Sequence, residues 1–128
     1  MIKYIGRINR NQVNELYGSA RAGICIYQPA VNHYEAQPIK MFEFMAAGLP
    51  VVASNFPLWK HIIEDAKCGI CVDPQNSEEV KVACKSLIFN PLEAEIMGRN
   101  GRQVVEKVYN WGTQEEKLLA LYDEIMLK

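Results

Sequence analysis

Two glutamates are the side chains of this sequence that packing alone explains least well. Glu43 lies within residues 41–47, a segment that is otherwise apolar, and Glu35 precedes it with seven residues between them. A carboxylate that is buried without a partner is costly, so Glu43 must pair with another group or face a cleft. Vicinal sugar hydroxyls are natural donors to a carboxylate, as the ribose contact of dinucleotide-binding folds illustrates. The pair therefore favours a cleft that binds a sugar.

A structural role for Glu43 stays open beside this interpretation. Lys40 lies three residues earlier, and an ion pair at that spacing on an exposed helix face contributes roughly 0.2–0.5 kcal/mol. In the ligand-binding interpretation, Lys40 instead adds positive charge to the first turn of a helix that begins near Pro38. The free N–H groups and the dipole of such a helix start attract phosphate.

Strand-like and helical segments alternate along the first half of the chain and must position these residues. The apolar runs that predict strands are residues 2–5, 22–27, 50–54 and 69–72, and the expected helices between them are residues 11–20, 38–47 and 57–64. This alternation is typical of a parallel sheet with helices on its faces, which binds ligands beyond the carboxyl ends of its strands. The loop 28–37, which carries Glu35, follows such a strand end.

The second half of the chain is helical. Ser77 can cap a helix with Glu78 and Glu79 in its first turn, and Pro91 marks the start of another. Thr113 has the spacing of a capping box for a last helix. We therefore expect one domain over residues 1–128. Its fold class is α/β, a Rossmann-like three-layer sandwich with about four parallel strands and a helical C-terminal part.

Charge and hydropathy exclude several classes of partner. The 128 residues include 14 Lys and Arg against 15 Asp and Glu, a net charge of −1. Such a balance supplies no long-range attraction to nucleic acid or to an anionic membrane. No apolar run reaches the roughly 18 residues that span a bilayer, and the first residues lack the features of a signal peptide. The expected location is the cytoplasm.

The cysteines and other conspicuous side chains have structural explanations. Cys68 and Cys71 have the C-x-x-C spacing, but zinc requires four ligands, and Cys25 and Cys84 stand alone. We expect the four cysteines to serve as small apolar filler, and we expect no metal site. Trp59 and Trp111 are expected to anchor packing, His33 to be a solvated loop residue, and Arg99 and Arg102 to be helix-surface charges.

The segment from Glu35 to Ser54 resembles the E-x7-E region of retaining GT-B glycosyltransferases. It is most similar to the large family 4 group, which builds lipopolysaccharide, capsule and related glycans. Other segments follow in the family's order, and the resemblance extends over nearly the whole chain: Ile5-Gly6, residues 69–74, residues 97–102 and Tyr109-Asn110-Trp111.

The resemblance implies roles for individual residues. Glu43 matches the glutamate that binds the nucleotide ribose, and Glu35 matches the one that faces the transferred sugar, the candidate catalytic residue. The turn formed by Gly6, Arg7 and Ile8 matches the place where backbone contacts the base.

The diphosphate site implied by the resemblance shows departures from the family's pattern. Ile39 and Lys40 align with a Gly-containing stretch whose amides hold the diphosphate, but Pro38 lacks an N–H. Residues 54–57 also depart from the Gly-rich turn often found there. The implied substrate is a nucleotide-diphosphate sugar, and neither a metal nor another cofactor is expected.

The resemblance covers only part of a GT-B enzyme. The chain matches the last two-thirds of the nucleotide-sugar half, without the N-terminal domain that carries most of the acceptor site. It also lacks the Arg and Lys that the family supplies to the diphosphate. The full-length protein is expected to be a retaining transferase acting on a glycan or lipid-linked acceptor in cell-surface polysaccharide or lipopolysaccharide synthesis. Any membrane contact would be peripheral and made by that full-length protein, and the chain alone should be inactive.

Two further expectations follow. The alternative function is a non-catalytic interaction or regulatory module with a flavodoxin-like fold.

In the incomplete sheet, residues 2–5 would form an edge strand without neighbours, and exposed strand edges recruit other strands. Residues 2–5 should therefore move inward to pair with residues 22–27, or two chains should join their edges in a homodimer.

Overall fold

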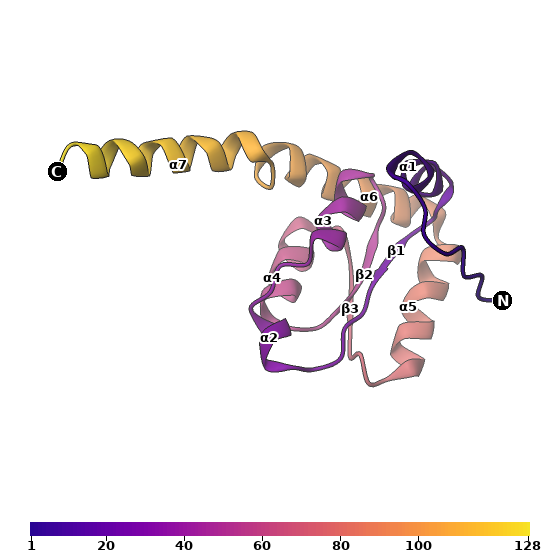
Figure 1. Ribbon diagram of the computed structural model, residues 1–128. Helices are drawn as coiled ribbons and strands as arrows, with labels where there is room; N and C mark the ends of the chain where they lie inside the picture. Colours follow the sequence, from indigo (N-terminus) through magenta and orange to yellow (C-terminus); the bar gives the residue numbers. More distant parts are fainter.

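The computed structural model describes all residues, 1–128, as a small parallel sheet with helices around it (Figure 1). Three strands pair in the order β1-β2-β3, with Ile24 opposite Val52 and Val52 opposite Ile70. The elements in chain order are α1 (Arg10–Ser19), β1 (Gly23–Cys25), α2 (Val31–Tyr34), α3 (Ile39–Ala46), β2 (Val51–Ser54), α4 (Pro57–Ala66), β3 (Gly69–Val72), α5 (Ser77–Phe89), α6 (Pro91–Lys107) and α7 (Trp111–Met126).

Helices cover both faces of the sheet, as the alternation predicts. Successive strand residues point to opposite faces, so Val51 and Ala53 of β2 join one core while Val52 joins the other. The first core packs against α3 and α4 and the second against α5 and the start of α6. In Figure 1, α3 and α4 accordingly lie on one side of the sheet and α5 on the other. The α/β class is confirmed.

The prediction that residues 2–5 form an edge strand is wrong. Residues 2–5 form no strand, and Ile2 and Tyr4 are almost fully exposed. Gly6 has a φ of +71°, which turns the chain so that Ile5 lines a cavity against α1 instead of pairing with β1. The sheet therefore has three strands instead of about four. Residues 2–5 do not pair with β1. Such a pairing would add one row of hydrogen bonds but would leave the apolar side chains of residues 2–5 uncovered. A homodimer through this edge stays a prediction.

Helix ends follow local capping rules, with small differences from the expectation. The cap of α5 is Asn76, whose side chain accepts from the N–H groups of Glu78 and Glu79, so Ser77 is the first helical residue. Asn110 caps α7 by accepting from the N–H of Thr113, so Thr113 is not the cap. Short polar side chains compete for this position, and the one with extended backbone takes it.

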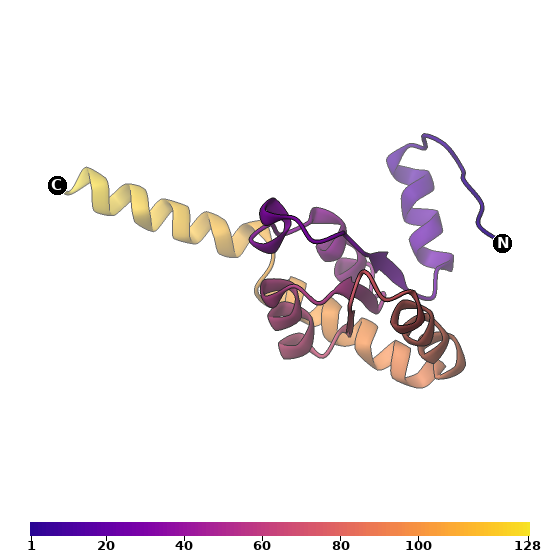
Figure 2. The same cartoon turned by 90° about the horizontal axis from the view of Figure 1, so that it is seen from below.

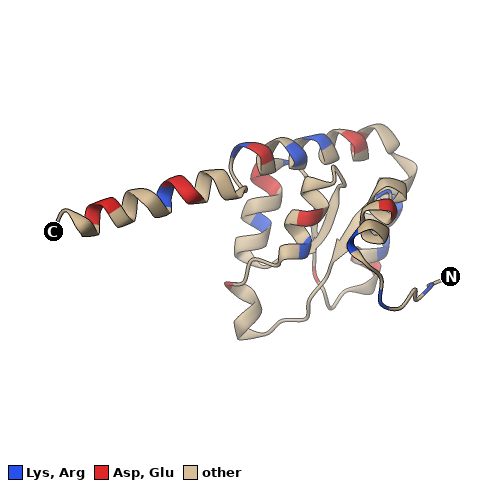
Figure 3. Ribbon diagram, turned by 45° about the horizontal axis from the view of Figure 1, so that its top comes forward, with Lys and Arg blue, Asp and Glu red and all other residues tan.

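Helix α6 crosses the end of α3 at close range, and glycines make this possible. A Cβ atom on Gly98 would lie 2.0 Å from the carbonyl oxygen of Gly48, and one on Gly101 would lie 3.4 Å from the Cα of Met45. Gly48 itself has a φ of +73° and ends α3, as the sequence predicts. Acidic and basic residues are interspersed along α6, in keeping with the near-zero net charge (Figure 3).

Helix α7 leaves the body of the molecule (Figures 1 and 2). None of its residues is buried, and Trp111 at its start is 68% exposed, so the expected packing role of Trp111 is wrong. Trp59, by contrast, is 1% exposed within the first core, as expected. None of the helices combines the length and hydropathy of a membrane-spanning segment.

Candidate functional site

The segment that carries Glu35 is held by buried polar groups at the carboxyl ends of the strands. Ser54, at the end of β2, accepts from the Tyr27 N–H at 2.8 Å and donates to the Tyr27 carbonyl at 2.9 Å. The indole N–H of Trp59 donates to the Ala36 carbonyl at 2.6 Å. These bonds fix both ends of a loop that also contains the short helix α2, where the sequence predicts only loop.

Glu35 and the start of α3 lie at the same end of the sheet. Glu35 follows α2 directly, is exposed, and forms no side-chain hydrogen bond or ion pair. Pro38 is the cap of α3 and supplies no side-chain hydrogen bond. Because the first N–H groups of a helix have no intrahelical acceptor, those of Ile39 and Lys40 are free to bind a ligand. This end can hold an anion beside a free carboxylate.

Glu43 reaches across to helix α1. Its side chain is 31% exposed. One oxygen accepts from the guanidinium of Arg10 at 2.6 Å, and the other accepts from the hydroxyl of Tyr17 at 3.2 Å. The structural alternative, an ion pair with Lys40 inside the same helix, is absent from the structure. Glu43 thus links α3 to α1.

A cavity of about 420 Å³ opens beside this contact. Its lining residues come from α1, the C-terminal end of α3 and α6, and they are Arg10, Asn14, Tyr17, Gly18, Glu43, Ala46, Ala47 and Arg102. Glu35 and Lys40 are not among them. This cavity is therefore not a cleft shared by both glutamates, and the sugar-binding cleft expected for the pair stays a prediction.

The remaining predicted residues lie just before α1. Gly6 and Arg7 are exposed coil, Ile8 is half-buried, and Asn9 caps the helix that Arg10 begins. The predicted base-binding turn is therefore connected to Glu43 through Arg10. Sequence reasoning missed both Arg10 and Tyr17, because their contact with Glu43 spans 33 and 26 residues.

Electrostatic effects near the site are modest and have clear causes. Burial and the negative charge of Glu43 raise the pKa of Tyr17, so its hydroxyl keeps its proton and remains a donor. Burial raises the pKa of the Cys25 thiol to about 11, although the Lys40 ammonium opposes the shift.

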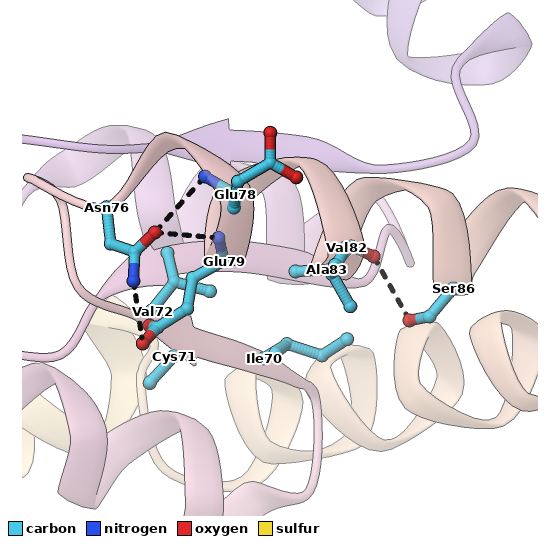
Figure 4. Close-up of a pocket in the computed structure, with 9 residues that line it drawn as sticks. All are labelled: Ile70, Cys71, Val72, Asn76, Glu78, Glu79, Val82, Ala83 and Ser86. Carbon is cyan, nitrogen blue, oxygen red and sulfur yellow. Dashed lines mark hydrogen bonds between the residues drawn. The ribbon is translucent and has the colours of Figure 1, made fainter.

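A second cavity, of about 500 Å³, lies between β3 and α5 (Figure 4). Its walls are mostly apolar side chains of the strand and the helix, including Ile70 and Val82. The polar groups of Asn76 and Ser86 are engaged with the backbone of α5. This cavity therefore offers few free polar groups to orient a ligand.

The thiols contribute to packing. Cys25 and Cys68 are buried in the first core, all four cysteines are free, and burial raises the pKa of Cys71 to about 12. No group of three or more His, Cys, Asp or Glu side chains is arranged to hold a metal ion. The filler interpretation of Cys25 and Cys68 is confirmed.

Comparisons with known proteins point to one family. Residues 1–104 match the profile described as Glycosyl transferases group 1. Spore coat protein SA of Bacillus subtilis is 27% identical over 128 residues, which cover 96% of this chain and 32% of that protein. Sucrose synthase of Denitrovibrio acetiphilus is 30% identical over 128 residues, covering 93% of this chain and 16% of that protein.

A solved structure agrees with the sequence comparisons. Sucrose-phosphate synthase from Thermosynechococcus elongatus superimposes with a TM-score of 0.81 and 25% sequence identity, covering 98% of this chain and 30% of that chain. The chain therefore spans about a third or less of the relatives described here.

Proposed function

Since the chain belongs to the group 1 glycosyl transferases, of the GT-B superfamily, we propose that it forms the donor-binding part of a larger sugar-transferring enzyme. In this proposal the donor is a nucleotide-diphosphate sugar and Glu43 accepts hydrogen bonds from the nucleotide ribose. We propose that the enzyme resembles the family 4 glycosyltransferases, and that no metal or further cofactor takes part in the reaction.

The exposure and hydrogen bonding of the Glu43 carboxylate are the observation that supports this proposal most. The carboxylate emerges from an apolar helix, is partly exposed, and borders a cavity. Each of its oxygens receives one hydrogen bond from the protein. A carboxylate oxygen accepts about two, so one site on each oxygen is free. Two vicinal hydroxyls match this pair of acceptors.

The other site residues take their roles from their places along the donor. The N–H groups of Ile39 and Lys40, with the Lys40 ammonium, face the diphosphate at the start of α3. Glu35, exposed and unpaired, faces the transferred sugar and is the candidate catalytic residue. The backbone of Gly6, Arg7 and Ile8 contacts the base.

Sugar transfer itself is proposed only for the full-length protein. Because the relatives are about three or more times as long, we place the acceptor site in a part of the protein outside this chain. The reaction is proposed to retain configuration and to take place in the cytoplasm. Its acceptor is a glycan or a lipid-linked glycan of a cell-surface polysaccharide or lipopolysaccharide pathway, with membrane contact only peripheral.

Titration of the chain with UDP, GDP and ADP, followed by NMR, tests donor binding. We expect millimolar affinity, about −4 kcal/mol, with shifts at residues 6–8 and 35–43 for at least one nucleotide. Glu43→Ala should weaken binding by roughly 1–3 kcal/mol, the scale of a lost charged hydrogen bond. Glu95→Ala, which removes another half-exposed glutamate paired with an arginine, should leave affinity unchanged.

Two results would contradict the proposal. The absence of shifts at both segments with all three nucleotides would exclude donor binding. Sugar transfer catalysed by the 128-residue chain alone would show that the acceptor site lies within it.

A further inference from the structure

We propose that Arg10 and Tyr17 are positioning residues that hold the Glu43 carboxylate in the orientation that accepts the sugar diol, an inference that rests on the proposed function. Both residues come from α1 and reach a carboxylate on α3. Neither residue carries the diol itself. Their contribution is to fix the acceptor before the ligand arrives.

The geometry restrains both oxygens of the carboxylate. Arg10 donates to Oε1 at 2.6 Å and Tyr17 donates to Oε2 at 3.2 Å. One bond alone would leave the carboxylate free to rotate about its last torsion, whereas two bonds to different oxygens set both its direction and its plane. The unused acceptor sites of the two oxygens then keep one orientation beside the cavity.

Tyr17 is itself anchored by aromatic packing. Its ring packs edge-on against Phe44 with the centroids 5.6 Å apart. Phe44 in turn packs so closely over Gly23 that a Cβ there would lie 2.1 Å from the ring. The hydroxyl of Tyr17 is thereby held at a fixed place relative to β1 and α3. Because the pKa of Tyr17 is raised, the hydroxyl remains a donor well above neutral pH.

Stability alone does not account for this arrangement. The Arg10 side chain is 62% exposed, and ion pairs this exposed contribute little to stability because water and salt screen them. A long glutamate side chain loses much rotational freedom when it binds a ligand. Restraint before binding removes that cost from the binding step, which is how preorganisation increases affinity.

A double-mutant cycle on nucleotide affinity tests the inference. The probe is whichever of UDP, GDP and ADP binds the unaltered chain most tightly. We expect Arg10→Ala and Tyr17→Phe each to weaken binding three- to tenfold, with partial recovery in Arg10→Lys. In a Glu43→Ala background, Arg10→Ala should have no further effect, because it acts through that carboxylate.

The control and a second readout separate positioning from general loosening of α1. Arg99→Ala removes an arginine whose ion pair with Glu95 lies within α6, and it should not change affinity. Side-chain couplings of Glu43, measured by NMR without ligand, should indicate one rotamer in the unaltered chain and averaging in Arg10→Ala and Tyr17→Phe.

Each contrary outcome has a distinct meaning. Unchanged affinity in both variants of a chain that binds nucleotide would overturn this inference and leave the proposed function standing. Additive effects of Arg10→Ala and Glu43→Ala would also overturn it, because Arg10 would then act on the ligand directly. If none of the nucleotides binds the unaltered chain, the proposed function fails and this inference fails with it.

Discussion

Ser54 and Trp59 determine where Glu35 lies, and both do so by satisfying backbone groups of the loop. Ser54 is fully buried and exchanges two hydrogen bonds with the backbone of Tyr27. Trp59 fills the first core and donates to the carbonyl of Ala36, next to Glu35. Buried backbone groups without partners are costly, so these side chains select one path for the loop. The position of the candidate catalytic carboxylate thus depends on residues outside the predicted donor site.

Ser54→Ala should therefore destabilise the chain. The substitution leaves the N–H and the carbonyl of Tyr27 without these partners, which costs about 1–3 kcal/mol for a buried group. Urea denaturation monitored by circular dichroism measures the change. Ser19→Ala is the matched control, since the Ser19 hydroxyl is exposed and donates only to the Leu16 carbonyl in its own helix. Equal stability of the two variants would contradict the assignment of Ser54.

Helix α6 is the element that holds α3, and hence Glu43, in place. It crosses α3 at Gly98 and Gly101, where backbone approaches backbone. Arg102 of the same helix donates to the carbonyl of Ala46 at the C-terminal end of α3. Such a close crossing is possible only where side chains are absent or extend outwards. Helix α7, by comparison, has no buried residue and no role in this packing.

Gly98→Ala should loosen this crossing. The new methyl group would meet the Gly48 carbonyl at 2.0 Å, so α6 must move away, at a cost of roughly 1–3 kcal/mol for an overpacked contact. Gly18→Ala in α1 is the contrast, because nothing lies within 4 Å of the new atom. It should be neutral or stabilise α1 by roughly 0.5–1 kcal/mol. Denaturation midpoints that shift equally for both variants would exclude the steric explanation.

The α7 helix should open independently of the rest of the chain. A helix of this length is marginally stable in water without tertiary contacts. We expect its amides to show little hydrogen-exchange protection, while the amides of β2 show the most, because that strand is buried throughout. Removal of residues 118–128 should change the unfolding free energy by less than about 0.5 kcal/mol. Strong protection in α7 would instead indicate association through its exposed apolar side chains.

The whole molecule is a three-stranded sheet with two cores, and β1 and β3 each have one edge without a partner strand. The larger core includes Cys25 and Cys68, whose thiols are kept neutral by burial. The outer edge of β1 has no partner strand, and Ile24 on it is 53% exposed. An exposed edge of this kind promotes association. Both features affect how the isolated chain behaves in solution.

Alkaline pH should destabilise the chain through its thiols. Burial raises the pKa of Cys25 and Cys68 from 9.0 to about 11 and that of Cys71 to about 12. The folded state therefore binds these protons more tightly than the unfolded state. The stabilisation is complete below pH 9 and is lost as pH rises through the folded-state pKa values. Urea denaturation between pH 8 and about 11.5, under reducing conditions, should show this decline.

Replacing the thiols tests this origin of the pH dependence. Cys71→Ala should reduce the slope of stability against pH above about 9, because one shifted thiol is removed. Cys84→Ala serves as the control, since Cys84 is also half-buried and free. An unchanged slope in Cys71→Ala would assign the alkaline loss to other groups.

Local features of the sequence determined the elements around the site. The alternation of apolar runs with capped helices predicted β1, β2 and β3, the start of α3 at Pro38 and its end at Gly48. These features depend on residues within one or two turns of each other, so periodicity and capping are sufficient to predict them. The E-x7-E spacing likewise identified Glu35 and Glu43 as the residues to examine.

Tertiary structure decided the features that join distant segments. Residues 2–5 have the composition of a strand and the outer edge of β1 is unpaired, yet a strand added there would leave its apolar side chains uncovered. The partners of Glu43 are Arg10 and Tyr17, which lie on another helix rather than one turn away. No local pattern specifies which carboxylate an arginine 33 residues away will meet. The sequence by itself indicated Glu43 as a candidate for sugar binding, and the packing of α1 against α3 decided how its carboxylate is held.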